Sequence, residues 1–304
     1  MRSPSSRFKS PGVALKVSET LLWFALTVIP CVAAVAAQLD SASDSPSSVE
    51  SAAVDPLDAG YRLEGALVRL QQGRAEAPVA AGSASKLVTS ALGEPTLGDL
   101  DGDGDEDAAL VLIHSGGGSG TFYYVTVARN VQGAYQGSNG VWLGDRILVQ
   151  DVAVRHGMLI VRYLDRETHE PMISAPTVPK TVVLYLEKGA LSVGARLSGT
   201  EQLLEGWLTI GHEVRSFVPC GKGVEHWLMG SSPALGEITA GYREQTGDAP
   251  AYTPVFVVLA GQVSKPPTEG FGADYPAAIV ASRLVGMPPD GRCADESRPE
   301  AGNE

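Results

Sequence analysis

The chain has 304 residues, 44% of them apolar, and its 35 acidic residues against 23 basic ones give a formal net charge of −12. A chain of this length can bury one or two ordinary hydrophobic cores. The acidic balance argues against a nucleic-acid-binding protein, because such proteins carry an extended basic surface. Short runs of Val, Leu and Tyr, separated by Gly and Pro, indicate a mainly β fold.

Residues 1–37 have the composition of an export signal. Basic residues precede an apolar run over 21–37, which ends in the small residues Val35-Ala36-Ala37. This order is typical of a secretory signal peptide, so we expect cleavage after Ala37. The run is also long enough for an uncleaved membrane anchor, and Cys31 within it leaves lipid attachment open. Each alternative places the mature chain in the periplasm or elsewhere in the cell envelope.

Residues 38–60 are predicted to be a disordered linker. They are rich in Ser, Ala and Asp and show no apolar periodicity. Such a segment cannot bury enough surface to offset the entropy lost on ordering. We therefore expect a flexible tether between the export signal and the folded part.

The most informative stretch of the chain is its acidic segment, 99–107. Aspartates occupy the first, third, fifth, seventh and ninth positions, and glycine the sixth: Asp99, Asp101, Asp103, Asp105, Asp107 and Gly104. This is the ligand spacing of a calcium loop. Two like charges 4 Å apart repel by roughly 4 kcal/mol at an effective dielectric of about 20, so converging carboxylates need a cation. Oxygen donors on a flexible loop favour calcium over magnesium. The alternative is a solvated acidic turn.

The segment after the acidic loop argues against a helical EF-hand. Position 12 is Leu110 instead of a bidentate glutamate, and 108–113 is apolar and strand-like. The loop resembles the D-x-D-x-D-G-x-x-D loops of integrin-type (FG-GAP) repeats, in which a β-hairpin carries the ion. This resemblance implies side-chain ligands from four aspartates and a carbonyl ligand from the other: Asp99, Asp101, Asp103 and Asp107, and Asp105.

Residues 61–197 are predicted to form a β-rich domain that carries the acidic loop. Strand patterns occur at 61–70, 108–114, 121–128, 145–154, 157–164 and 180–186, whereas 84–92 fits a helix or a strand. The glycine-rich run 115–120 predicts a hairpin. It is not a phosphate-binding loop of the known type, because neither a lysine nor a helix follows it.

The order of motifs in this region resembles a group of uncharacterised bacterial exported and lipoprotein domains. The matching segments are 98–107, 117–124, 143–146 and 165–172, all within 61–193. The resemblance implies the envelope of a Gram-negative bacterium and names no reaction.

Residues 198–286 are predicted to form a second, OB-like β domain. Two strands are expected within 204–220, others at 225–229 and 252–263, and a helix over 233–245. Strands, one helix and more strands is the order of a small OB-like barrel. This part resembles the C-terminal OB-fold domain of NlpE-type outer-membrane lipoproteins. The C-x-x-C motif of that family is missing, so the resemblance does not imply metal-linked stress sensing.

These predictions together give a mainly β chain of α+β class. Two small β-rich domains follow an N-terminal signal or anchor helix, and 287–304 forms a polar tail. If Cys31 is removed by cleavage or buried in the membrane, the remaining Cys220 and Cys293 can form a disulfide in an oxidising compartment. Two free thiols are the alternative. A zinc site at Cys220, His212 and His226 fits no standard ligand spacing.

The sequence favours a non-catalytic function. It contains no recognisable catalytic triad or nucleophile elbow, and His156 and His169 lie in predicted turns, where we expect exposed side chains. Asp145 with Arg146 and Asp165 with Arg166 are expected to be surface charge pairs. We predict an exported, calcium-stabilised module that binds an envelope protein or a small ligand. The alternative is a carboxylate-based hydrolase of cell-wall or sugar substrates, which needs two acids at a suitable separation.

Overall fold

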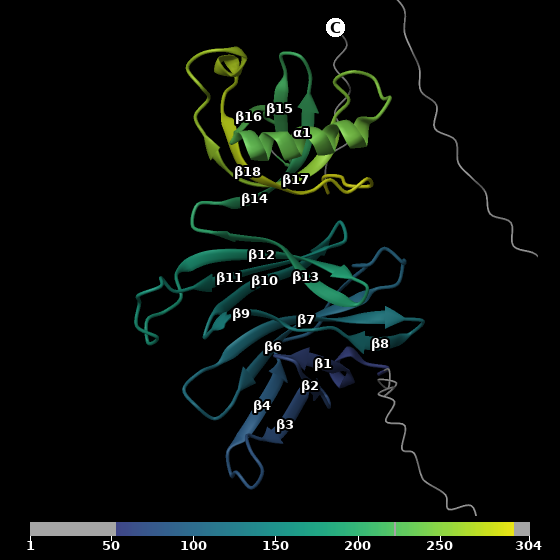
Figure 1. Cartoon of the computed structure of the whole chain (residues 1–304), viewed down its shortest axis with the longest axis vertical. Coiled ribbons are helices and arrows are strands. Elements are labelled where there is room, and N and C mark those ends of the chain that lie inside the picture. The colour runs from purple at the N-terminus through teal and green to yellow at the C-terminus, as the bar shows by residue number, and fades with distance from the viewer. Residues whose placement is uncertain (1–52, 222, 295–304) are drawn as a thin grey trace, which may run out of the picture. The chain divides into compact units, whose positions relative to one another are not determined.

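The first domain contains two antiparallel sheets and a short hairpin. The computed structural model describes residues 53–221 and 223–294, so the predicted signal or anchor 1–37 and most of the predicted linker lie outside it. Strands of the first sheet lie in the order β3-β4-β6-β7-β8, with β5 beside β6 and β9 beside β7 (Figure 1). Their bounds are β3 Arg74–Pro78, β4 Lys86–Ala91, β5 Thr96–Gly98, β6 Asp107–Ser115, β7 Phe122–Val131, β8 Ala134–Gly137 and β9 Val141–Asp145.

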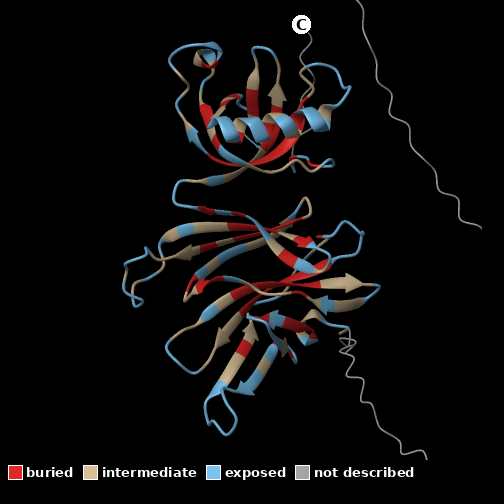
Figure 2. Ribbon diagram, viewed as in Figure 1, coloured by how far each residue is buried: buried red, intermediate tan, exposed pale blue. Residues whose placement is uncertain are grey.

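The second sheet packs on the first and completes a β-sandwich. Its order is β10-β11-β12-β13, with bounds β10 Leu148–Arg155, β11 Met158–Asp165, β12 Val178–Glu187 and β13 Ala190–Ser198. One core joins Val111 and Val125 of the first sheet to Val161 and Leu184 of the second. Alternate residues of a strand face opposite sides of its sheet. Ile160 accordingly faces a different core, which explains why the first four residues of β11, 158–161, are all apolar and buried. Figure 2 shows the buried residues of the two sheets in red.

The hairpin of β1 (Gly60–Leu63) and β2 (Ala66–Arg69) covers the other face of the first sheet. The sequence predicted one strand over 61–70, but Glu64 and Gly65 turn the chain with φ of 51° and 85°. Positive φ at both central residues is the geometry of a two-residue type I′ turn, which matches strand twist. Tyr61 and Leu63 on this hairpin are buried against Leu110 of β6.

The described residues already form regular structure before residue 60, the predicted end of the linker. Ala53 pairs with Tyr135, and a 3-10 helix, η1 (Pro56–Asp58), follows the capping side chain of Asp55. The side chain of Tyr61 reaches back to η1 and donates a hydrogen bond to the carbonyl of Pro56. The linker prediction was wrong for these last residues, because their packing on the hairpin outweighs their polar composition.

Two other predictions need adjustment. The undecided segment 84–92 contains strand β4, which pairs with β3 and β6. The single strand predicted over 145–154 is broken at Arg146, whose φ is 51°. The break sends β9 to the first sheet and β10 to the second.

The second folded part is a closed barrel with strand order β14-β15-β16-β18-β17. The bounds are β14 Gln202–Ile210, β15 Arg215–Pro219, β16 His226–Gly230, β17 Val255–Ser264 and β18 Ala278–Gly286, with a 3-10 helix, η2, at Phe271–Asp274. Helix α1, Ser232–Thr246, lies across the barrel (Figure 1), and Ile238 and Tyr242 enter its core. The helix predicted over 233–245 and the mainly β character of the chain are confirmed.

The sandwich and the barrel share an apolar core. Ile160 and Val183 of the second sheet pack with Phe256 and Val258 of β17. The predicted boundary between residues 197 and 198 lies at the end of β13, so it separates the strands of the sandwich from those of the barrel. The apolar core, in contrast, is continuous across this boundary. Within the described ranges, no helix is long and apolar enough to span a bilayer.

Candidate metal centre

The acidic loop connects two paired strands. Strand β5 ends at Gly98, β6 begins at Asp107, and these two residues are register partners. The loop between them brings carboxylate oxygens of Asp99, Asp101 and Asp107 within 4.8 Å of one another. Oxygens that ligate one calcium ion at 2.3–2.6 Å lie at most about 5 Å apart, so these three carboxylates can hold a metal ion.

Backbone hydrogen bonds within the loop orient the half-buried carboxylate of Asp99. Asp99 accepts hydrogen bonds from the N–H groups of Gly102 at 2.7 Å and Gly104 at 3.1 Å. Both glycines have a left-handed backbone, with φ of 79° and 91°, which side-chain-bearing residues rarely adopt. The D-G-D-G pattern therefore curls the loop around the Asp99 carboxylate.

Asp107 is the buried member of the group, with 0% of its surface exposed. Its Oδ2 accepts from the Leu100 N–H at 3.0 Å, and its Oδ1 accepts from the Asn130 N–H at 2.9 Å. Burial raises the pKa of this carboxyl, the two backbone hydrogen bonds oppose the rise, and the nearby charges of Asp101 and Asp103 add to it. Asp107 thus fixes both the loop and the end of β7 around one carboxylate.

The other two predicted ligands lie outside the three-carboxylate group. Asp103 and Asp105 are exposed, and the carboxylate of Asp103 accepts a hydrogen bond from the N–H of Asp105 at 2.9 Å. Side-chain ligation by Asp103 and carbonyl ligation by Asp105 remain predictions.

A cation that the sequence did not single out lies beside the group. Nη1 of Arg129, on β7, is 3.5 Å from Oδ2 of Asp101. The pairing of β6 with β7 brings Arg129 to the loop. Nothing local in the sequence distinguishes this arginine, because its position depends on strand register.

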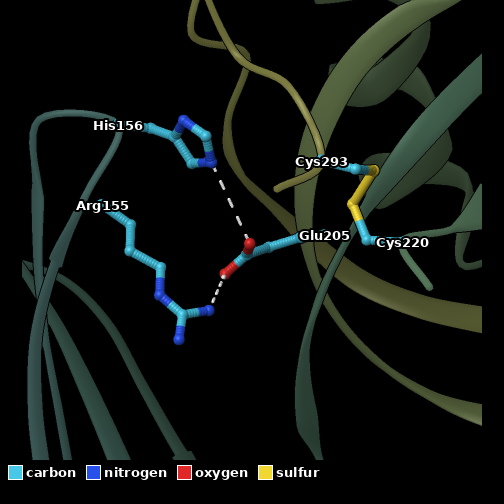
Figure 3. Close-up of a disulfide and its surroundings, with 5 residues drawn as sticks. All are labelled: Arg155, His156, Glu205, Cys220 and Cys293. Carbon is cyan, nitrogen blue, oxygen red and sulfur yellow. Dashed lines mark ion pairs between the residues drawn. A yellow bond between two sulfur atoms is a disulfide. The ribbon is translucent and has the colours of Figure 1, made fainter. Parts of the chain in front are cut away.

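Away from the loop, Cys220 and Cys293 form a disulfide with a Cα–Cα distance of 5.4 Å across 73 residues. Figure 3 shows this disulfide together with Arg155 and with His156 of the β10–β11 turn, both of which point toward Glu205 of β14. The distances to Glu205 oxygens are 3.6 Å from Arg155 Nη1 and 4.0 Å from His156 Nε2.

The structure revises the expected environment of several polar residues. His156 was expected to be exposed, but it is half-buried against Phe256, with ring centroids 4.7 Å apart. Because Cys220 is in a disulfide, it is not available to the rejected zinc site. The described residues place no further metal-binding group of three or more ligands near His212 or His226.

The two Asp-Arg motifs behave differently from each other. Asp145 and Arg146 form the expected ion pair at 3.0 Å. Asp165 instead pairs with Lys180 at 2.6 Å. The guanidinium of Arg166 donates hydrogen bonds to the carbonyls of Ser174 and Arg146. It therefore connects the loop after β11 to the turn after β9.

Comparison with protein-family models, curated proteins and solved structures finds no match for this chain.

Proposed function

We propose that this chain is a non-catalytic, exported protein of the cell envelope whose sandwich is stabilised by calcium on the acidic loop. The observation that carries the proposal is the convergence of Asp99, Asp101 and Asp107 within 4.8 Å, with Asp107 buried. In this proposal, the surface of the sandwich or of the barrel binds a partner protein or a small ligand.

The donor chemistry supports a hard divalent cation. The three converging groups are carboxylates, and the exposed segment 101–106, which contains two glycines, offers further oxygens for the high coordination number of calcium. Asp99, Asp101 and Asp107 would hold the ion, with Asp103 and the Asp105 carbonyl completing the set. The ion would neutralise repulsion among the carboxylates and so stabilise the β5–β6 connection.

The form of the barrel supports an OB-like binding domain. If the five barrel strands are numbered by their order in the sequence, their order in the barrel is first-second-third-fifth-fourth. Along the chain, α1 follows the third strand and precedes the fourth. A five-stranded Greek-key barrel of this kind commonly presents a binding face and loops. The disulfide supports export, because disulfides persist in oxidising compartments. The apolar N-terminal run, which the sequence predicts to be a signal or an anchor, would direct this export.

Thermal unfolding with calcium and with EDTA tests the proposal. A ligand at 100 times its Kd stabilises the native state by about 2.7 kcal/mol, which corresponds to a rise in Tm of about 5–10 °C for a chain of this size. We expect this rise in the wild-type protein and its loss in the double variant Asp99→Asn, Asp101→Asn. An unchanged Tm in protein shown by elemental analysis to be metal-free would refute the calcium site.

A further inference from the structure

A second polar site lies near the acidic loop, in a pocket of about 340 Å³ between β1, β7, β8 and the β12–β13 turn. Its lining includes three cationic residues, Arg62, Arg129 and Lys188, and no acidic residue. The chain has 35 acidic residues against 23 basic ones, so this local excess of positive charge runs against the overall balance. The volume falls within the range of small-molecule pockets.

The walls of this pocket are tied together by hydrogen bonds. Asn139 donates from Nδ2 to the carbonyl of Leu191 at 3.1 Å and accepts from the N–H of Leu191 at 2.8 Å. The N–H of Arg62 bonds to the carbonyl of Ser138, and that of Gly140 to the carbonyl of Arg62. The first sheet, the hairpin and the second sheet are thereby joined around the cations. A preformed site loses little entropy when it binds a ligand.

Two of the cations have capacity left for an anion. Lys188 is exposed in a tight turn with φ of 52°, and it has no ion-pair partner within residues 53–221 and 223–294. Arg129 has one ion pair, the 3.5 Å contact with Asp101, and its buried Nε meets no acceptor in the same described ranges. Like charges that line one pocket repel, and an anion bound among them relieves that repulsion.

We propose that this pocket binds a phosphoryl group, with Arg62, Arg129 and Lys188 as its ligands. Arginine presents a planar fork of donors that matches phosphate oxygens, and lysine adds a point charge. A dianion suits three cations better than a single carboxylate does. A small soluble phosphate ester and the headgroup of an anionic phospholipid share this chemistry. The pocket is linked to the acidic loop through the ion pair of Arg129 with Asp101, but the proposal does not require a bound calcium ion.

The test measures binding of inorganic phosphate to the full folded chain by isothermal titration calorimetry. A second measurement follows co-sedimentation with vesicles of phosphatidylglycerol, with phosphatidylcholine vesicles as reference. The variants are Lys188→Gln and Arg62→Gln, which remove a charge from exposed positions. Lys265→Gln is the matched control, because Lys265 is exposed and does not line the pocket.

We expect one phosphate per chain and a loss of about tenfold in affinity for each pocket variant, the effect of removing one hydrogen bond to a charged group. Lys265→Gln should bind like the wild type. Binding of phosphatidylglycerol vesicles that the same two variants weaken would identify a lipid headgroup as the source. The proposal is overturned if neither probe binds, or if Lys188→Gln and Arg62→Gln bind like Lys265→Gln.

Discussion

Asp107 combines two roles that the acidic pattern alone does not separate. As the last aspartate of the loop it converges with Asp99 and Asp101, but both of its oxygens also accept backbone hydrogen bonds. An unpaired buried donor loses its hydration without compensation. The carboxylate of Asp107 therefore stabilises the loop even without an ion.

Substitution of Asp107 by Asn should reveal this structural role. The amide keeps one acceptor oxygen but turns an NH2 group toward the backbone N–H of Leu100 or of Asn130. We expect a loss of about 1–3 kcal/mol in the free energy of unfolding, the cost of leaving a buried donor without a partner. Urea denaturation in EDTA measures this loss independently of any ion.

The matched control for that experiment is Asp105→Asn. Asp105 belongs to the same acidic loop, but it is exposed, so its substitution should change stability by less than about 0.5 kcal/mol. Equal effects of the two substitutions would show that Asp107 contributes only charge to the loop.

At the scale of elements, the β10–β11 turn is a contact between the sandwich and the barrel. His156 in this turn is half-buried; it faces Glu205 of β14 (Figure 3), and its ring packs against Phe256 of β17. Burial lowers the pKa of His156, Glu205 opposes this, and Arg155 and Arg292 lower it further. The folded state therefore binds the proton of His156 less readily than the unfolded chain does.

This contact should make stability depend on pH. The unfolded histidine takes up a proton near its ordinary pKa of about 6.5, and the folded one only at a lower pH. Between the folded and the unfolded pKa, the unfolded state binds more protons than the folded state. Neutral His156 therefore contributes to the free energy of unfolding above the unfolded pKa, and this contribution is lost as the pH falls through that pKa and below it. We expect the free energy of unfolding of the wild type to decrease relative to that of His156→Asn when the pH is lowered from about 7.5 to about 5.5.

Denaturation of both proteins at each pH measures this difference. Asn tolerates the positive φ of the turn, and the comparison cancels the contribution of His114, whose pKa burial also lowers. A difference that does not change with pH would contradict the proposed linkage.

The elements that the sequence predicted well are those whose pattern is local. The helix over 233–245 has its apolar spacing, a cap and a stop within one segment, and α1 follows it closely. The break at Arg146 and the turn at Glu64 depend on a left-handed backbone at residues that rarely adopt it. The break at Arg146 accompanies the pairing of β9 with β7 and of β10 with β11, whereas the turn at Glu64 closes the local hairpin of β1 and β2.

The same distinction holds for the candidate sites. The acidic loop is contiguous, so its aspartates could be identified, although the pattern did not predict that only Asp99, Asp101 and Asp107 converge. The cationic pocket collects Arg62, Arg129 and Lys188 from three sheets. Nothing in the sequence near any one of these residues indicates the other two, so only the folded structure brings them together.

At the scale of the whole molecule, the described residues form a series of apolar cores between successive layers. The hairpin packs on the first sheet, the first sheet on the second, and the second sheet on the barrel, whose interior holds a further core. Cys293 is buried in the core between the second sheet and the barrel. The disulfide with Cys220 therefore links the segment after β18 covalently to the core that lies between the sandwich and the barrel.

Loss of this disulfide should destabilise the molecule without separating its parts. Closure of a loop whose cysteines are 73 positions apart in the sequence is worth about 4 kcal/mol in the chain-entropy description. We expect the double variant Cys220→Ala, Cys293→Ala to lose about that much free energy of unfolding in urea. The shared core of Ile160, Val183, Phe256 and Val258 remains, so calorimetry should still show one transition.

Wild-type protein unfolded in the presence of a reductant provides the control, because it loses the bond without a change of residue. Its stability should approach that of the double variant. Two separate thermal transitions in the variant would instead show that the disulfide, and not the apolar contact between β12 and β17, makes the sandwich and the barrel unfold together. The side chains of this contact, Ile160, Val183, Phe256 and Val258, are at most 3% exposed, and removing them from water is favourable. We therefore expect the contact alone to keep the two parts cooperative.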